Sequence, residues 1–197
     1  MQSPVDSSSL LRPGLLDAVR VVVAGGGAES RFGAAVAARC EALGAGVERF
    51  DLDPFGDEPT APEGEAEVLV WDGAGAFESR EGVDAVRAAL DGAWLAIRPF
   101  ARAATSGGAD GGKVLLLAPP PGSAHAEAAR AGLENLARTL SIEWARFGVR
   151  LVAVHPGPET EPAELAELAA FLASRAGEYY SGCLFELGAA QPSTPVT

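Results

Sequence analysis

Residues 21–40 read VVVAGGGAESRFGAAVAARC, and this stretch is the clearest indication of the fold. It opens with a short apolar run led by three valines, which is typical of a strand buried on both faces of a parallel sheet. A run of glycines follows, and small apolar residues then recur at helical spacing as far as Leu43. The stretch therefore predicts a strand, a glycine turn and a tightly packed helix.

The same alternation of apolar strands and amphipathic helices continues along the chain. Further strands are predicted at residues 47–52, 68–71, 114–117, 149–154 and 184–187, and further helices at residues 83–104, 124–147 and 161–176. Strands that alternate with helices form a parallel sheet covered on both faces. The sequence therefore predicts an α/β fold, a Rossmann-like doubly wound parallel sheet of about six strands.

The length of 197 residues fits one domain with a sizeable core. We expect an N-terminal lead-in at residues 1–18, a single Rossmann-like domain at residues 19–188 and a disordered tail at residues 189–197. The segment before residue 68 is rich in proline, glycine and acidic residues, so a loop is expected there.

The formal net charge is -12 at pH 7, and the acidic residues are spread along the chain. Nucleic acids and anionic membrane surfaces would repel such a chain, so we expect neither as a partner. Cys40 and Cys183 have neither a CxxC nor a metal-ligand spacing, which favours a cytoplasmic setting and no metal site. No apolar run approaches the roughly 20 residues that a membrane helix needs.

From about residue 20 to residue 188, the order of these signals resembles that of the short-chain dehydrogenase/reductase family. The motifs are the strand and glycine turn at residues 21–33, DGAG at residues 72–75 where the family has Asn-Asn-Ala-Gly, and RAGLENLARTLSIEWARFGVRLVAVHPG at residues 130–157. The resemblance implies a Rossmann fold and hydride transfer between NAD(P) and a carbonyl or alcohol.

The resemblance also indicates a truncated member of the family. Between the second and third predicted strands the family has a helix, a strand and another helix, whereas a short loop alone joins them here. After Gly157 the family inserts a mobile lid, whereas this chain leads almost directly into its last helix. We therefore expect the sheet edge beside the adenine and the cover over the substrate to be missing.

All four catalytic positions of the family differ in this chain. Aligning RAGLENL with the family's Lys-Ala-Ala/Gly-Leu puts Arg130 at the catalytic lysine and Ala126 at the catalytic tyrosine. Pro119 then lies at the serine position, and Asp91 at the helix asparagine. Ala126 has no proton to transfer, so the sequence predicts a catalytically degenerate member with no catalytic residue at this site.

The glycine turn carries the candidate cofactor-binding residues. In the Rossmann fingerprint, glycines make the turn, let the pyrophosphate approach and pack the helix. Either Gly25 or Gly27 can be the first glycine, and in the second case Arg31 replaces the middle one. Asp51 is either a ribose-binding acid or an ordinary strand-end acid. We expect no cofactor, with NAD(H) as the open alternative; the candidate residues are Gly25, Gly27, Arg31, Gly33, Asp51, Gly73 and Gly75.

The two helices with which family members build a dimer interface are both kept, at residues 83–104 and 124–147. Our first hypothesis is a non-catalytic subunit that assembles through these helices with itself or with an active dehydrogenase that it supports. Two alternatives stay open: a divergent NAD(P)(H)-dependent oxidoreductase acting on a carbonyl or alcohol, and a nucleotide-binding sensor without turnover. The candidate anchors of the interface are Trp94, Phe100, Trp144 and Phe147.

Overall fold

Six parallel strands form the centre of the computed structural model, which describes residues 10–27, 30–52, 55, 66–105 and 111–188. The spatial order of the strands is β2-β1-β3-β4-β5-β6, so the predicted Rossmann-like sheet is confirmed. The strands are β1 (Arg20–Ala24), β2 (Gly46–Phe50), β3 (Val68–Asp72), β4 (Gly112–Leu117), β5 (Val149–His155) and β6 (Cys183–Glu186).

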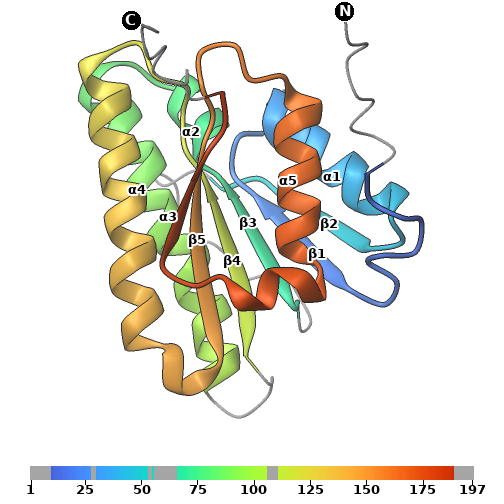
Figure 1. The fold of residues 1–197 in the computed structure, drawn as a ribbon. Coiled ribbons are helices and arrows are strands. Elements are labelled where there is room, and N and C mark those ends of the chain that lie inside the picture. The colour runs from blue at the N-terminus through green and yellow to red at the C-terminus, as the bar shows by residue number, and fades with distance from the viewer. Residues whose placement is uncertain (1–9, 28–29, 53–54, 56–65, 106–110, 189–197) are drawn as a thin grey trace, which may run out of the picture.

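Two layers of helices cover the sheet, with α1 and α5 on one face and α3 and α4 on the other (Figure 1). The helices are α1 (Arg31–Ala42), α2 (Gly73–Glu78), α3 (Gly82–Thr105), α4 (Ala124–Glu143) and α5 (Pro162–Ala173), with short 3-10 helices η2 (Ala145–Phe147) and η3 (Arg175–Tyr179).

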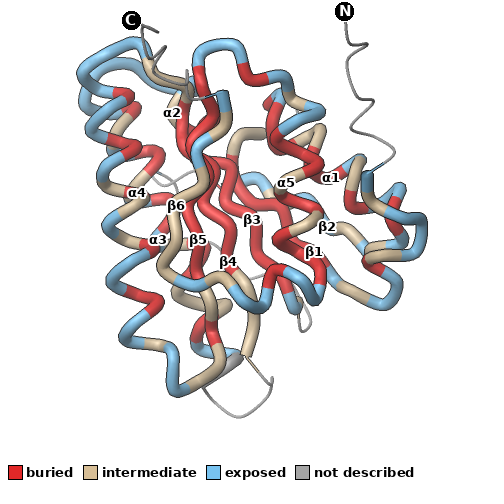
Figure 2. Tube along the Cα trace, viewed as in Figure 1, coloured by how far each residue is buried: buried red, intermediate tan, exposed pale blue. Residues whose placement is uncertain are grey.

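Alternate residues of each central strand face the two helix layers. In β1, Val21 and Val23 pack beneath α1 and α5, whereas Val22 and Ala24 pack beneath α3 and α4. Figure 2 shows the resulting band of buried residues through the middle of the sheet. Because both faces of these strands are buried, their sequences are apolar runs and not alternating patterns.

The structure differs from the sequence prediction at the ends of several elements. The predicted third strand, at residues 68–71, extends to Asp72, and the rest of the DGAG motif begins the short helix α2, because the Asp72 side chain accepts a hydrogen bond from the Gly75 N–H and caps it. Helix α4 ends at Glu143 and not at residue 147, and the following turn closes on Gly148 at φ 71°. Helix α5 ends at Ala173, three residues before the predicted end at residue 176.

The second half of the expected lead-in packs on the domain. Leu16 is fully buried in the core beneath α1 and α5, and its N–H donates to the Leu43 carbonyl at 2.9 Å. Residues 1–9, the expected tail at 189–197 and most of the expected loop before residue 68 lie outside the described residues. Within the described part of the chain, β2 forms the outer edge of the sheet beside β1.

Candidate functional site

The glycine turn lies where the strand order reverses. The chain leaves β1 for β2 on one side and returns to β3 on the other, and ligands of such sheets bind at this switch point. Gly25, Gly26 and Gly27 have φ values of 86°, 72° and 62°. These left-handed conformations strain residues with a Cβ, so the backbone itself explains why the turn is made of glycine.

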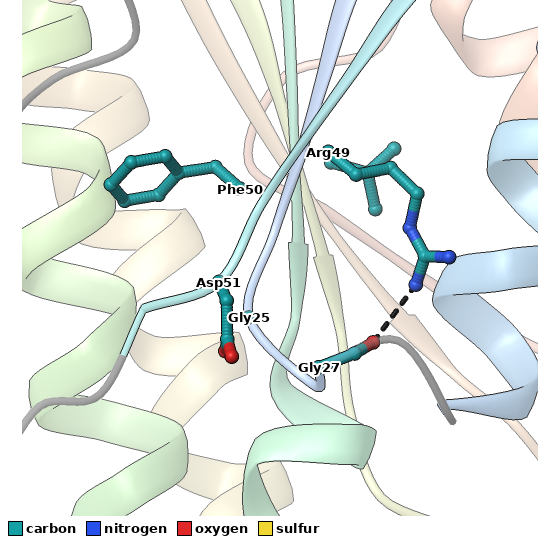
Figure 3. Close-up of a pocket in the computed structure, with 6 residues that line it drawn as sticks. Gly25, Gly27, Arg49, Phe50 and Asp51 are labelled. Atoms are coloured by element: carbon teal, nitrogen blue, oxygen red, sulfur yellow. Dashed lines mark hydrogen bonds between the residues drawn. The ribbon is translucent and has the colours of Figure 1, made fainter.

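A cavity of about 230 Å³ lies between this turn and the end of β2. Gly25, Gly27 and Asp51 line it, so the structure brings these three candidate residues together (Figure 3). In Figure 3 the Asp51 carboxylate lies beside Gly25, while Arg49 reaches the turn from the other side of β2. The Arg49 Nη2 donates to the Gly27 carbonyl at 2.8 Å and ties the turn to the edge strand.

The indole of Trp71 occupies the space behind the first glycine of the turn. Trp71 is fully buried, and its Nε1 donates to the Ala89 carbonyl at 2.9 Å. A Cβ on Gly25 would lie 2.7 Å from the indole, and a Cβ on Gly92 in α3 would lie 2.5 Å from it. Gly25 is therefore required by packing as well as by its φ angle.

The next strand residue, Asp72, faces the opposite helix layer and contacts the N-terminus of α1. Its carboxylate accepts hydrogen bonds from the Ser30 hydroxyl, the Gly33 N–H and the Gly75 N–H. Two further candidate residues, Gly33 and Gly75, thus pack around a side chain of the protein itself. The remaining candidate glycine, Gly73, is closely packed too, since its Cβ would lie 2.7 Å from the Leu117 carbonyl oxygen.

Arg31 is the first residue of α1 and is exposed. Its guanidinium carbon lies 4.4 Å from the centre of the Phe32 ring, so the side chain stacks on that ring. Glu29, two residues before Arg31 in the sequence, lies outside the described residues.

The four residues that the resemblance placed at catalytic positions have different surroundings. Ala126 is 3% exposed and packs in the protein interior, and Pro119 is buried at the end of β4. Arg130 is 9% exposed, and its Nη1 donates to the carbonyl oxygens of Pro119 and Pro156, each at 2.9 Å. Asp91 lies on the surface, where its carboxylate accepts from the Arg87 Nε at 3.2 Å.

A second cavity, of about 660 Å³, lies at the carboxyl ends of β5 and β6 and beside Arg130. Its described lining holds one guanidinium and three carboxylates, and it contains neither a tyrosine nor a lysine. The lining residues are Pro121, Arg130, Gly157, Pro158, Glu159, Thr160, Glu164, Glu186, Leu187 and Gly188. The described lining therefore offers no phenol that could donate a proton to an alkoxide in the way that a tyrosine does.

His155, at the end of β5, is 4% exposed. Burial lowers the pKa of its imidazole, and the neighbouring Arg130 charge lowers that pKa further. The His155 imidazole therefore takes up a proton less readily than an exposed histidine does. The other histidine, His125, is exposed at the start of α4.

The two thiols are expected to differ in reactivity. Burial raises the pKa of Cys40 to about 12, and its side chain is fully buried, whereas Cys183 is half-buried on β6. Because the thiolate is the reacting species, we expect a thiol-specific reagent at pH 8 to label Cys183 in the folded protein and Cys40 only after unfolding. Mass spectrometry of digested, labelled protein checks this; labelling of Cys40 at the rate of Cys183 in the folded state would contradict it.

The described residues contain no group of three or more histidine, cysteine, aspartate or glutamate side chains able to hold a metal ion. Nor does any helix in the described part of the chain combine the length and apolar character needed to cross a membrane.

Known proteins with similar sequence or structure are oxidoreductases. No family model matches the chain. A probable 2,4-dienoyl-CoA reductase of Bacillus subtilis (strain 168) is 34% identical over 90 residues, which cover 31% of this chain and 35% of the reductase. The match thus spans about a third of that relative's length. The solved structure of a citronellol catabolism dehydrogenase (AtuB) of Pseudomonas aeruginosa PAO1 superposes with a TM-score of 0.70 at 25% identity, covering 91% of this chain and 97% of that chain.

These similarities support a dehydrogenase-related, oxidoreductase-like protein with a Rossmann-like fold. The positions of the two cavities agree with these similarities. Both cavities, of about 230 Å³ and 660 Å³, lie at the carboxyl ends of parallel strands, where enzymes of this architecture bind ligands.

Proposed function

We propose that this chain is a non-catalytic, dehydrogenase-like subunit that assembles through the outer surface of α3 and α4. The supporting observation is the state of Arg130, which stands at the family's lysine position. Its guanidinium is buried and joins the ends of β4 and β5 through the Pro119 and Pro156 carbonyls. A group held in this way serves to join the two strand ends.

The absence of a proton donor at Ala126 supports the same proposal. Reduction of a carbonyl needs an acid within hydrogen-bond reach of the substrate oxygen. The methyl group of Ala126 is buried, and the described lining of the larger cavity supplies carboxylates and one guanidinium instead. Hydride transfer to a carbonyl would leave an alkoxide with no suitable donor among these residues.

The surface available for assembly runs along the two helices. We define the α3–α4 surface by five apolar residues: Val83, Leu90, Trp94, Ile142 and Trp144. Val83, Trp94 and Ile142 are 65%, 43% and 79% exposed. The rings of Trp94 and Trp144 stack across the helix pair with centroids 6.5 Å apart and an angle of 21° between their planes. Exposed apolar side chains that lie together on one surface are typical of interaction sites.

The other two predicted anchors lie differently. Phe100 is half-buried against the start of β4, where a Cβ on Gly112 would lie 2.5 Å from its ring. Phe147 is half-buried in η2, and the Arg146 guanidinium covers its ring at 4.6 Å. Both pack against the core beneath α3 and α4. Trp144 is also half-buried against this core, so Trp94 is the one of the four predicted anchors that is exposed, and the proposed interface centres on Trp94 and on Trp144 stacked against it.

Arginine at the centre of the α3–α4 surface is expected to break the assembly. We expect Trp94→Arg and Ile142→Arg each to shift the purified protein to monomer, because each places a charge on a surface that must be desolvated. Light scattering coupled to size-exclusion chromatography measures the change. Leu10→Arg is the matched control, because Leu10 is 65% exposed and the next residue, Leu11, packs beside α5 on the other face of the sheet, so this change should leave the mass unchanged.

The partner is identified by co-expressing the chain with a dehydrogenase encoded beside it. If the natural chain assembles with itself and Trp94→Arg does not, the result supports a homo-oligomer. A monomer that co-purifies with and activates the dehydrogenase, and loses both properties in Trp94→Arg, supports the subunit role. A chain that is monomeric alone and neither co-purifies with nor activates a dehydrogenase overturns the proposal.

One observation favours the nucleotide-binding alternatives. Asp51, Gly25 and Gly27 meet at one cavity, and a strand-end acid of this kind is suited to a ribose diol. These alternatives predict that NAD(H) raises the melting temperature. Turnover of carbonyl compounds would then distinguish an oxidoreductase from a sensor.

A further inference from the structure

A carboxylate of the protein itself already occupies the N-terminus of the helix that follows the glycine turn. Asp72 is fully buried at the end of β3. Its Oδ2 accepts hydrogen bonds from the Gly33 N–H at 3.1 Å and from the Ser30 hydroxyl. Its Oδ1 accepts from the Gly75 N–H at 3.0 Å, at the start of α2. The same carboxylate thus joins the first turns of two helices.

The space around this carboxylate also accounts for the small residues nearby. A Cβ on Gly26 or on Gly33 would contact the Asp72 Oδ2 closer than any normal non-bonded contact. A Cβ on Gly75 would lie 2.6 Å from the Gly26 Cα. These glycines are therefore needed to enclose Asp72, whether or not a ligand approaches the turn from outside.

The electrostatics of the turn follow from this arrangement. A helix N-terminus attracts anions through its free N–H groups and its dipole, and Rossmann folds use it to hold a pyrophosphate. Here the Gly33 N–H and the Ser30 hydroxyl of that first turn are bonded to Asp72. When Asp72 is ionised, a pyrophosphate would bring a second anion close to this buried carboxylate, in a region where charges are weakly screened. The described residues of the turn therefore do not fit a dinucleotide diphosphate while Asp72 carries its charge.

We infer that Asp72 is the built-in anion of the glycine turn and that its ionised, carboxylate form excludes a dinucleotide from this site. The turn then serves to join the sheet to α1 and α2. The inference concerns the turn alone and does not depend on how the chain assembles. If it failed, the subunit role would still be decided by the mass and co-purification measurements.

The charged groups near Asp72 make the inference sensitive to pH. Burial, the largest effect, raises the pKa of the Asp72 carboxyl; the hydrogen bonds from Ser30, Gly75 and Gly33 oppose this rise, as does the charge of Arg49 on β2. A raised folded-state pKa means that the folded protein binds this proton more readily than the unfolded chain does. The stability that the folded protein gains by holding this proton is fully present below about pH 3.9, the usual pKa of an aspartate carboxyl. It is lost as pH rises through the pKa of Asp72 in the folded protein.

Asp72→Asn tests the inference, because an amide has the same shape without the charge. It can accept from the Gly75 N–H and donate to the Ser30 oxygen, which already lies 3.4 Å from the Gly33 nitrogen. Isothermal titration at pH 8 with inorganic pyrophosphate, and separately with NAD⁺, measures binding. Removing one nearby charge should raise the affinity of the turn for pyrophosphate by about tenfold or more. Asp84→Asn, an equal charge change at an exposed position on α3, should leave it unaltered.

The pH dependence of unfolding is the second measurement. Urea unfolding measures the free energy of unfolding at each pH from 4 to 8. As pH rises over this range, we expect the free energy of unfolding of Asp72→Asn to increase relative to that of the natural chain. We expect Asp84→Asn to show the same pH dependence as the natural chain. Tight binding of pyrophosphate or NAD⁺ by the natural chain at pH 8 would overturn the inference. So would equal affinities of the natural chain and Asp72→Asn, or parallel stability curves for these two proteins.

Discussion

Replacing Trp71 with alanine is expected to lower the free energy of unfolding by about 3–5 kcal/mol, the usual range for a large aromatic side chain in a core. The indole is fully buried and fills the space between the glycine turn and α3. The variant loses this packing and also the hydrogen bond to the Ala89 carbonyl. Since domains of this size are stable by about 5–15 kcal/mol, the loss is a large fraction of the total.

Urea unfolding followed by circular dichroism measures this loss. Trp94→Ala is the matched control, since Trp94 has the same side chain but is 43% exposed on α3. We expect the control to cost less than half as much in the monomeric protein, because 43% of the Trp94 surface stays in contact with water whereas Trp71 is fully buried. Equal costs for the two tryptophans would show that the space behind Gly25 is not filled as described.

Replacing Arg130 with methionine is expected to lower the free energy of unfolding by about 2–4 kcal/mol. Methionine keeps much of the apolar stem but has no donor for the Pro119 and Pro156 carbonyls. Those two acceptors would then lie buried without the charge-assisted hydrogen bonds that now satisfy them. The effect is large because Arg130 is 9% exposed and its Nη1 satisfies both carbonyl acceptors at once.

Arg138→Met is the control for this second variant. The Arg138 side chain is 62% exposed and pairs with Glu134 at 2.6 Å on the same helix, so its loss should cost at most about 0.5 kcal/mol. Thermal and urea unfolding of the three proteins compare them directly. An Arg130→Met variant as stable as the Arg138→Met control would remove the main support for a structural role of Arg130, and with it the observation on which the proposed function rests.

The fold was predictable from the sequence because its signals are local. The valine run of β1 is apolar throughout, since the strand is buried on both faces, and the small residues of α1 recur on the helix face that packs on the sheet. The boundaries of α4 and α5 were less predictable. Helix ends depend on competing turns such as η2, whose energies differ little from those of one more helical turn.

The candidate site was predictable only in part. The sequence singled out Gly25, Gly27 and Asp51, which do meet at one cavity. It did not single out Trp71, Ser30 or Arg49, because a buried tryptophan, a helix-capping serine and a strand arginine carry no signal of the neighbours that they contact. Asp72 did carry a signal, since an acid stands where the resemblance implies an asparagine.

The sequence alone was enough to predict the order of strands and helices, the glycine turn and an alanine where the resemblance implies a tyrosine. Each is a property of residue type and spacing along the chain. The surroundings of the turn became known from the tertiary structure, because Gly25 packs against Trp71 and Gly33 packs against Asp72, which lie on another strand. Packing and burial between distant residues make the difference between a turn open to a phosphate and one enclosed around the protein's own carboxylate.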